Sequence, residues 1–175
     1  MKALQFIINT LLTLLVVAFM LRVLMPLVRA DFRNPFGAAI LKLTNPLVLP
    51  LRRFVPPGRR LDPASLIALL IVQFVKTALL LILGAGLRID ALLLGGLLDL
   101  LITVLKFYFW AILLYALLSW FAGAAYSPMS QVLGRLCEPL LSPVRRVIPP
   151  LGGLDLSALF VMIALQALLI LVSGA

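Results

Sequence analysis

Residues 45–62 read NPLVLPLRRFVPPGRRLD, and residues 138–155 read EPLLSPVRRVIPPLGGLD. The two stretches lie 93 residues apart and align without a gap. Over residues 34–73, thirteen of forty residues are identical to the residue 93 positions later. Many of the shared residues are prolines, arginines and an aspartate, so the likeness does not follow from a leucine-rich composition. The chain is therefore predicted to be a tandem duplication of one structural unit.

The chain is too apolar for a water-soluble domain of its size. Its 175 residues are 64% hydrophobic and its mean hydropathy is +1.22, whereas soluble domains are close to half apolar. It contains no histidine and a single cysteine, Cys137, which removes the usual general base, the commonest metal ligand and any internal disulfide. We expect a membrane protein that is not an enzyme and that has no cofactor or metal.

Four apolar stretches have about the length of a membrane-spanning helix, which is roughly 20 residues. They run over about residues 4–24, 64–83, 97–121 and 156–172. The sequence predicts an all-α membrane protein with two units, residues 1–84 and 97–175, joined by a glycine-containing link over residues 85–96. Each unit is expected to be a hairpin of two spans. The two hairpins are expected to have the same orientation, related by a pseudo-twofold axis along the membrane normal.

Basic residues are concentrated in the two repeated loops. Ten arginines and lysines lie within residues 29–62 and 122–155, whereas the opposite side holds only Lys2 and Arg88. Because positively charged loops stay in the cytoplasm, both repeated loops are predicted to be cytoplasmic and both termini to be non-cytoplasmic. A cleavable signal peptide is not expected, since Arg22 stands where small residues are required.

Each repeated block ends in an aspartate that precedes an apolar run. Asp62 and Asp155 are expected to cap the second span of their unit, because a carboxylate there can accept hydrogen bonds from the free N–H groups. Gln73 and Gln166 lie eleven residues further along, about 16 Å into the membrane. An unpaired amide is costly at this depth, so each glutamine is expected to bind the other or a backbone carbonyl of the neighbouring unit. A substrate or ion contact is the alternative.

A short amphipathic stretch precedes each block. Apolar residues recur there at helical spacing, namely Phe36, Ile40, Leu43 and Leu47 in the first copy and Met129, Val132, Leu133, Leu136 and Leu140 in the second. About ten residues are too few to cross a bilayer. Each stretch is expected to lie in the membrane interface, or to re-enter the membrane packed against protein.

Prolines surround a pair of arginines in each block. Four prolines stand between residues 46 and 57, and because proline fixes φ and lacks a donor, the chain is expected to be extended and stiff here. Arg52 and Arg53, like Arg145 and Arg146, would then be presented near the lipid headgroups, where guanidinium groups suit anionic phosphates. An acidic partner protein or a purely topological role are the alternatives.

Four charged residues lie inside predicted spans, namely Arg22, Lys76, Asp99 and Lys106. Neither lysine has a basic counterpart in the other unit, so both lie outside the repeated design. Charged groups at this depth are costly and often functional, which makes a path for an ion or proton one interpretation. Snorkelling, or pairing with Asp99 or a partner chain, is the other. Arg22, near the end of its span, is expected to snorkel.

The repeated pattern Pro-x3-Pro-x-Arg-Arg-x2-Pro-Pro, followed by Leu-Asp-x3-Leu-x6-Gln, resembles the YggT (also YlmG) family of small membrane proteins. The resemblance covers about residues 1–172. Family copies often place a serine after the aspartate, but Ser65 and Ser157 differ in register by one residue, so no role is transferred to them. Relatives are associated with assembly of a photosynthetic cytochrome complex, nucleoid distribution or division, and osmotic tolerance. The resemblance implies a scaffold or assembly factor in the bacterial inner membrane, with no agreed reaction.

These observations lead us to expect a non-enzymatic scaffold that binds anionic lipid headgroups and partner membrane proteins through its proline- and arginine-containing loops. A nucleic acid is not expected as a partner, because the basic loops are rich in proline and poor in the aromatic side chains on which bases stack. The alternative is a small transporter or channel linked to osmotic or ion homeostasis. Four spans enclose little volume, so this alternative requires a homo-oligomer.

Overall fold

The computed structural model describes residues 2–30, 34–56, 58, 61–84, 86–120, 128–147 and 156–174. Within these ranges the chain is all-helical. The helices are α1 (Lys2–Leu27), α2 (Pro35–Leu51), α3 (Pro63–Leu83), α4 (Ile89–Trp120), α5 (Pro128–Val147) and α6 (Leu156–Ser173). By length and composition, α1, α3, α4 and α6 are able to cross a membrane. The predicted all-α fold with four membrane spans is confirmed, and the protein is a multi-pass membrane protein.

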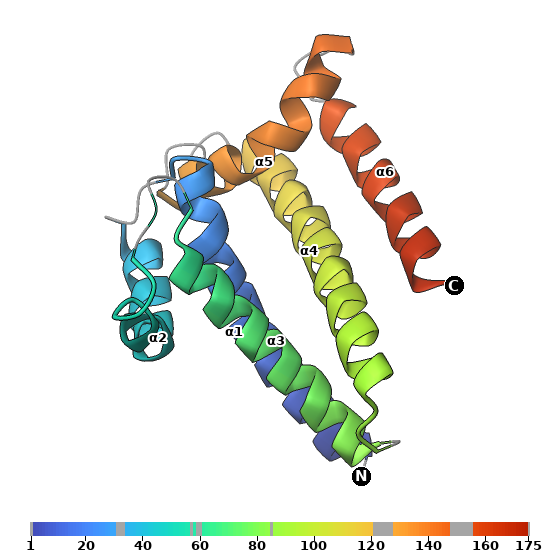
Figure 1. The fold of residues 1–175 in the computed structure, drawn as a ribbon. Coiled ribbons are helices and arrows are strands. Elements are labelled where there is room, and N and C mark those ends of the chain that lie inside the picture. The colour runs from blue at the N-terminus through green and yellow to red at the C-terminus, as the bar shows by residue number, and fades with distance from the viewer. Residues whose placement is uncertain are drawn as a thin grey trace.

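The long helices alternate in direction. Figure 1 shows α1 and α4 running one way, with α3 and α6 returning. Within the first half α1 packs against α3, and within the second half α4 packs against α6, while α3 and α4 contact each other across the halves. Figure 1 also shows α5 lying across the ends of α4 and α6, and α2 lying beside α1 near the same end of the protein. This end is called the α2/α5 end below.

The first two prolines of each repeated block lie inside a helix, so the prediction of an extended chain is wrong for these segments. Pro46 and Pro50 lie within α2, and Pro139 and Pro143 lie within α5. A proline cannot donate to the carbonyl four residues earlier. The two prolines of each helix are themselves four residues apart, so the missing bonds fall on one face and the other faces stay hydrogen-bonded. The helices are therefore 17 and 20 residues long, and α5 is visibly bent in Figure 1.

The link between the two halves is shorter than the predicted range 85–96. Helix α4 begins at Ile89, so Gly95 and Gly96 lie inside it. A Cβ added at Gly96 would stand only 2.9 Å from Cδ1 and Cε1 of Phe74 on α3. A residue without a side chain at this position lets the two helices approach closely, as small residues commonly do in membrane proteins.

Three apolar clusters hold the helices together. One lies among α1, α2 and α3 around Val16, Phe19 and Val48, and another lies among α4, α5 and α6 around Ile112 and Leu141. The third joins α1 and α2 of the first half to α5 of the second, through Leu21, Met25, Ala30, Ile40, Val132 and Leu136. The two halves are thus joined by apolar packing at the α2/α5 end and by the α3–α4 contact further along.

Candidate functional site

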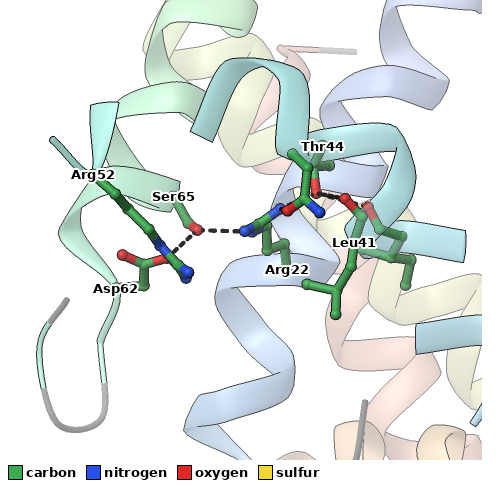
Figure 2. A network of polar contacts seen from close by, with 8 residues as sticks. Arg22, Leu41, Thr44, Arg52, Asp62 and Ser65 are labelled. Carbon is green, nitrogen blue, oxygen red and sulfur yellow. Dashed lines mark hydrogen bonds and ion pairs between the residues drawn. The ribbon is translucent and has the colours of Figure 1, made fainter. Parts of the chain in front are cut away.

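A buried guanidinium lies near the α2/α5 end of the first three helices. Arg22 of α1 is 3% exposed. Its Nε donates a hydrogen bond to Ser65 Oγ at 3.1 Å, and its Nη1 donates to Thr44 Oγ1 at 2.6 Å and to Asn45 Oδ1 at 2.9 Å. Figure 2 shows Arg22 between Thr44 and Ser65. The expectation that Arg22 snorkels is wrong, because these acceptors from α2 and α3 hold its guanidinium inside the protein.

The network continues through Ser65 to the residue that precedes α3 (Figure 2). Ser65 Oγ donates to Asp62 Oδ2 at 2.6 Å, and Arg52 donates to the same oxygen from Nη2 at 2.6 Å and from Nε at 3.2 Å. Asp62 stands at the N-cap position of α3, but its side chain makes no cap hydrogen bond. The capping role predicted for Asp62 is therefore wrong, since its carboxylate is bound by Arg52 and Ser65. Asp155 lies outside the described residues.

The surroundings of Asp62 favour its ionised form. Burial is the largest single influence and raises the pKa of the carboxyl. The hydrogen bonds from Arg52 and Ser65, together with the charges of Arg52 and Arg22, oppose it and leave the pKa of Asp62 below its ordinary value. The other carboxylate oxygen, Oδ1, is buried and has no hydrogen-bond partner among the described residues. The hydrogen bonds from Arg52 and Ser65 to this carboxylate therefore all go to one oxygen, Oδ2.

The two arginines of each repeated pair have different surroundings. The first arginine forms an ion pair with a carboxylate of the same chain: Arg52 Nη2 lies 2.6 Å from Asp62 Oδ2, and Arg145 Nη1 lies 3.0 Å from Glu138 Oε2. The second arginine, Arg53 or Arg146, is exposed. In each half, therefore, one arginine of the repeated block is held by a carboxylate of the chain, and the next is exposed without an ion pair among the described residues, a distinction that sequence reasoning missed.

The polar network around Arg22 is only partly repeated in the sequence of the second half. The positions 93 residues after three of its members hold less polar side chains that pack in the cluster of α4, α5 and α6, namely Tyr115, Cys137 and Ala158. Burial raises the pKa of the Cys137 thiol to about 12. The joint replacement of Arg22, Thr44 and Ser65 in the other copy was the sequence signal for this network.

A second polar cluster lies between α3 and α4. Gln73 Nε2 donates to the Gly96 carbonyl at 3.0 Å and to Asp99 Oδ2 at 2.8 Å. Lys76 Nζ forms an ion pair with the same Asp99 oxygen at 2.8 Å. The Lys76 side chain is 2% exposed, whereas that of Asp99 is 42% exposed. The ammonium is thus enclosed by protein and depends on a carboxylate that is open on one side.

The two repeated glutamines do not bind each other. Gln73 is fully buried, and its amide binds α4, whereas Gln166 on α6 is exposed. The predicted pairing is wrong because α3 packs against α1 and α4, while α6 packs against α4 and α5. The bond from Gln73 to the Gly96 carbonyl is instead the alternative that the sequence left open, a backbone partner on a neighbouring helix.

Lys76, Asp99 and Lys106 line one hollow of about 350 Å³ between α1, α3 and α4. Asn9 and Thr13 of α1 also line it. Lys106 is exposed, and among the described residues its ammonium has no carboxylate within ion-pair distance. Within the same residues no group of three or more histidine, cysteine, aspartate or glutamate side chains is placed to hold a metal ion.

Comparison with known proteins gives one family. The family model CCB3/YggT matches residues 1–83 and 94–175. The chain is 40% identical over 170 residues to "Uncharacterized protein PA0392" of Pseudomonas aeruginosa, which covers 95% of this chain and 86% of that protein. It is 36% identical over 168 residues to "Uncharacterized protein YggT" of Escherichia coli K12, which covers 96% of this chain and 88% of that protein.

A shorter match links the chain to a plant protein. The chain is 39% identical over 67 residues to "YlmG homolog protein 2, chloroplastic" of Arabidopsis thaliana, which covers 38% of this chain and 26% of that protein. No solved structure matches the chain. The family model and the two bacterial relatives extend over nearly all of the chain, including both repeated blocks. The chain therefore belongs to the CCB3/YggT family.

Proposed function

We propose that this protein is a non-enzymatic membrane scaffold, which binds anionic lipid headgroups through Arg53 and Arg146 and binds partner membrane proteins along its apolar helices. One observation carries the proposal. In each repeated pair the first arginine forms an ion pair with a carboxylate of this chain, whereas the second is exposed and forms no ion pair among the described residues. A role in topology alone requires positive charge but no such division between neighbouring residues.

The proposal places the protein in a bacterial inner membrane with its arginine-bearing loops in the cytoplasm. The concentration of ten basic residues in the two repeated loops supports this orientation. The cytoplasmic leaflet carries anionic lipids, and an arginine near its surface contributes about 1 kcal/mol to binding. The Arg52–Asp62 and Arg145–Glu138 pairs would anchor the neighbouring backbone, so that each exposed guanidinium is presented in a constant position.

Lipid retention by the purified full chain tests this function. Native mass spectrometry in detergent can count phosphatidylglycerol molecules bound to the wild type and to the double variant Arg53→Ala/Arg146→Ala. We expect the double variant to bind this lipid about tenfold or more weakly, from about 1 kcal/mol for each arginine. Arg88→Ala is the matched control, since Arg88 is also exposed but lies between α3 and α4.

Two outcomes would contradict the lipid-binding function. The double variant could retain as much phosphatidylglycerol as the wild type, which would leave the exposed arginines without a role in lipid binding. Alternatively, Arg88→Ala could lower retention equally, which would show that any exposed positive charge suffices. Phosphatidylethanolamine, which has no net charge, should be retained equally by all variants.

A second candidate function is ion transport by a homo-oligomer. The observation that favours it is the hollow in which Lys76, Asp99 and Lys106 meet within the candidate spans. Purified protein in liposomes should then support an ion flux that is lost in Lys106→Leu and kept in Lys42→Leu, a control on α2. A wild type without flux, or a Lys106→Leu variant with full flux, would reject transport through this hollow.

A further inference from the structure

Two hollows follow one another along α4. The first is the hollow of about 350 Å³ that contains Lys106, with walls from α1, α3 and α4. The second has a volume of about 200 Å³ and is lined only by apolar side chains of α1, α2, α4 and α5. Phe107 and Trp110 line both. Together the two hollows form one groove along α1 and α4, polar in its middle and apolar toward the α2/α5 end.

The charges in the polar part of the groove do not balance. Lys76 is paired with Asp99, but Lys106 has no carboxylate partner among the described residues. Lys106 lies seventeen residues after Ile89, the first residue of α4, which is about 26 Å along the helix. It therefore lies near the middle of a candidate span, where an uncompensated ammonium is costly. The polar part of the groove thus presents one positive charge that has no carboxylate partner among the described residues.

We propose that this groove binds a transmembrane helix of a partner protein that carries a carboxylate, and that Lys106 pairs with this carboxylate. The inference names the chemistry of the partner and so rests on the proposed scaffold function. The positive charge of Lys106 calls for a carboxylate on the partner, and Asn9 and Thr13, which line the same hollow, can donate hydrogen bonds to it. Apolar side chains of the same helix fill the second hollow, which has no polar lining.

Other occupants fit the groove less well. A lipid headgroup lies at the membrane surface, whereas Lys106 lies near the middle of its helix. In a second copy of this chain, the carboxylates of the candidate spans are Asp90 and Asp99 on α4. Asp99 lies seven residues from Lys106, about 10 Å along the helix axis, and is already bound by Lys76. Two copies side by side would therefore place their charges at different depths.

Synthetic membrane-spanning peptides provide a defined test. One peptide has about 22 apolar residues with a single glutamate at its centre, and its match has glutamine there. The full chain, labelled at its N-terminus, is reconstituted with each labelled peptide in phosphatidylcholine vesicles, and binding is measured by energy transfer. We expect the glutamate peptide to bind about threefold to fifteenfold more tightly than the glutamine peptide, the range of polar contacts between membrane helices.

Variants of Lys106 identify the pairing group. The preference for the glutamate peptide should disappear in Lys106→Met and persist in Lys106→Arg, which keeps the charge. Lys42→Met serves as the control, because Lys42 is an exposed lysine of α2 outside the groove. Circular dichroism of each variant confirms that the helices are retained. Moving the glutamate seven residues toward either end of the peptide should also abolish the preference, since its depth would no longer match.

Several results would overturn the proposal. Equal binding of the two peptides, or a preference that survives in Lys106→Met, would show that Lys106 recognises no carboxylate helix. Self-association of the chain that requires Lys106 would assign the groove to a second copy. Loss of the preference for the glutamate peptide when phosphatidylglycerol is added would show that the groove binds lipid. Because lipid retention by Arg53 and Arg146 is measured separately, a failure here leaves that part of the scaffold function standing.

Discussion

Replacing Asp99 by asparagine would leave an enclosed positive charge without its counter-ion. Lys76 Nζ lies 2.8 Å from Asp99 Oδ2, and the Lys76 side chain is 2% exposed. In the wild type, Gln73 Nε2 donates a hydrogen bond to Asp99 Oδ2 at 2.8 Å. Asparagine has the same size as aspartate and can still offer an oxygen to this donor. The substitution therefore removes the charge with little change in packing.

The size of the effect follows from the unequal burial of the two partners. Removing one member of a buried ion pair costs about 3–5 kcal/mol. Asp99 is 42% exposed, so the pair is only partly enclosed and we expect the free energy of unfolding to fall by about 2–3 kcal/mol. Lys76→Met should cost about 1 kcal/mol, because the half-exposed carboxylate keeps the Gln73 amide as a partner. The double variant should regain most of the loss caused by Asp99→Asn.

Reversible unfolding in mixed micelles measures these free energies. The purified chain and the three variants are titrated with sodium dodecyl sulfate and followed by far-ultraviolet circular dichroism. Asp90→Asn is the matched control on the same helix, because Asp90 pairs with Arg88 on the surface and both side chains are about 70% exposed, so its loss should cost less than about 1 kcal/mol. If Asp99→Asn costs no more than this control, or if Lys76→Met adds to its loss, the reasoning is refuted.

Three further predictions concern the helix contact, the α2–α3 ion pair and the buried thiol. Gly96→Ala should lower the free energy of unfolding by about 1–3 kcal/mol, because the new Cβ would stand 2.9 Å from the Phe74 ring. Gly95→Ala is the control, since a Cβ there has no neighbour within 4 Å. Equal losses for the two variants in the same micelle titration would contradict the contact. The pKa of Asp62 is lowered in the folded protein, so its ion pair stabilises the fold fully at a pH above the unfolded-state pKa of about 3.9. This stabilisation is lost as the pH falls through the lower, folded-state pKa. Stability should therefore fall less steeply with acid in Asp62→Asn, and identical acid profiles would argue against the pair. Cys137, whose pKa is about 12, should resist iodoacetamide at pH 8 until the chain is unfolded, and rapid labelling of the folded protein would show that the thiol is open.

The four spans could be predicted because a membrane imposes a local requirement. Each crossing helix needs about 20 consecutive apolar residues, and this pattern predicted α1, α3 and α6 within about three residues of their ends. The start of α4 was misjudged, since Gly95 and Gly96 suggested a link. The helix continues through them because backbone groups in lipid must bond within their own helix, and Gly96 packs closely against Phe74.

The helical structure of the proline-rich blocks could not be predicted from residue preferences alone. Prolines usually interrupt helices, but in α2 and α5 they are spaced by four residues and disturb only one helix face. The apolar stripes of these helices were correctly read as amphipathic. Their full length followed from packing, since Ile40 of α2 and Leu136 of α5 share a buried cluster with α1.

The sequence by itself determined the helical class, the number of candidate spans, the repeat and the residues that carry charge. Only the tertiary structure decided which polar groups meet. Arg22 binds Ser65, 43 residues away, and Gln73 binds Asp99 while its repeat partner Gln166 is exposed on α6. The physical reason is that a polar group in the membrane takes the partner offered by the helix beside it. That neighbour is chosen by side-chain packing between distant segments, which no local periodicity encodes.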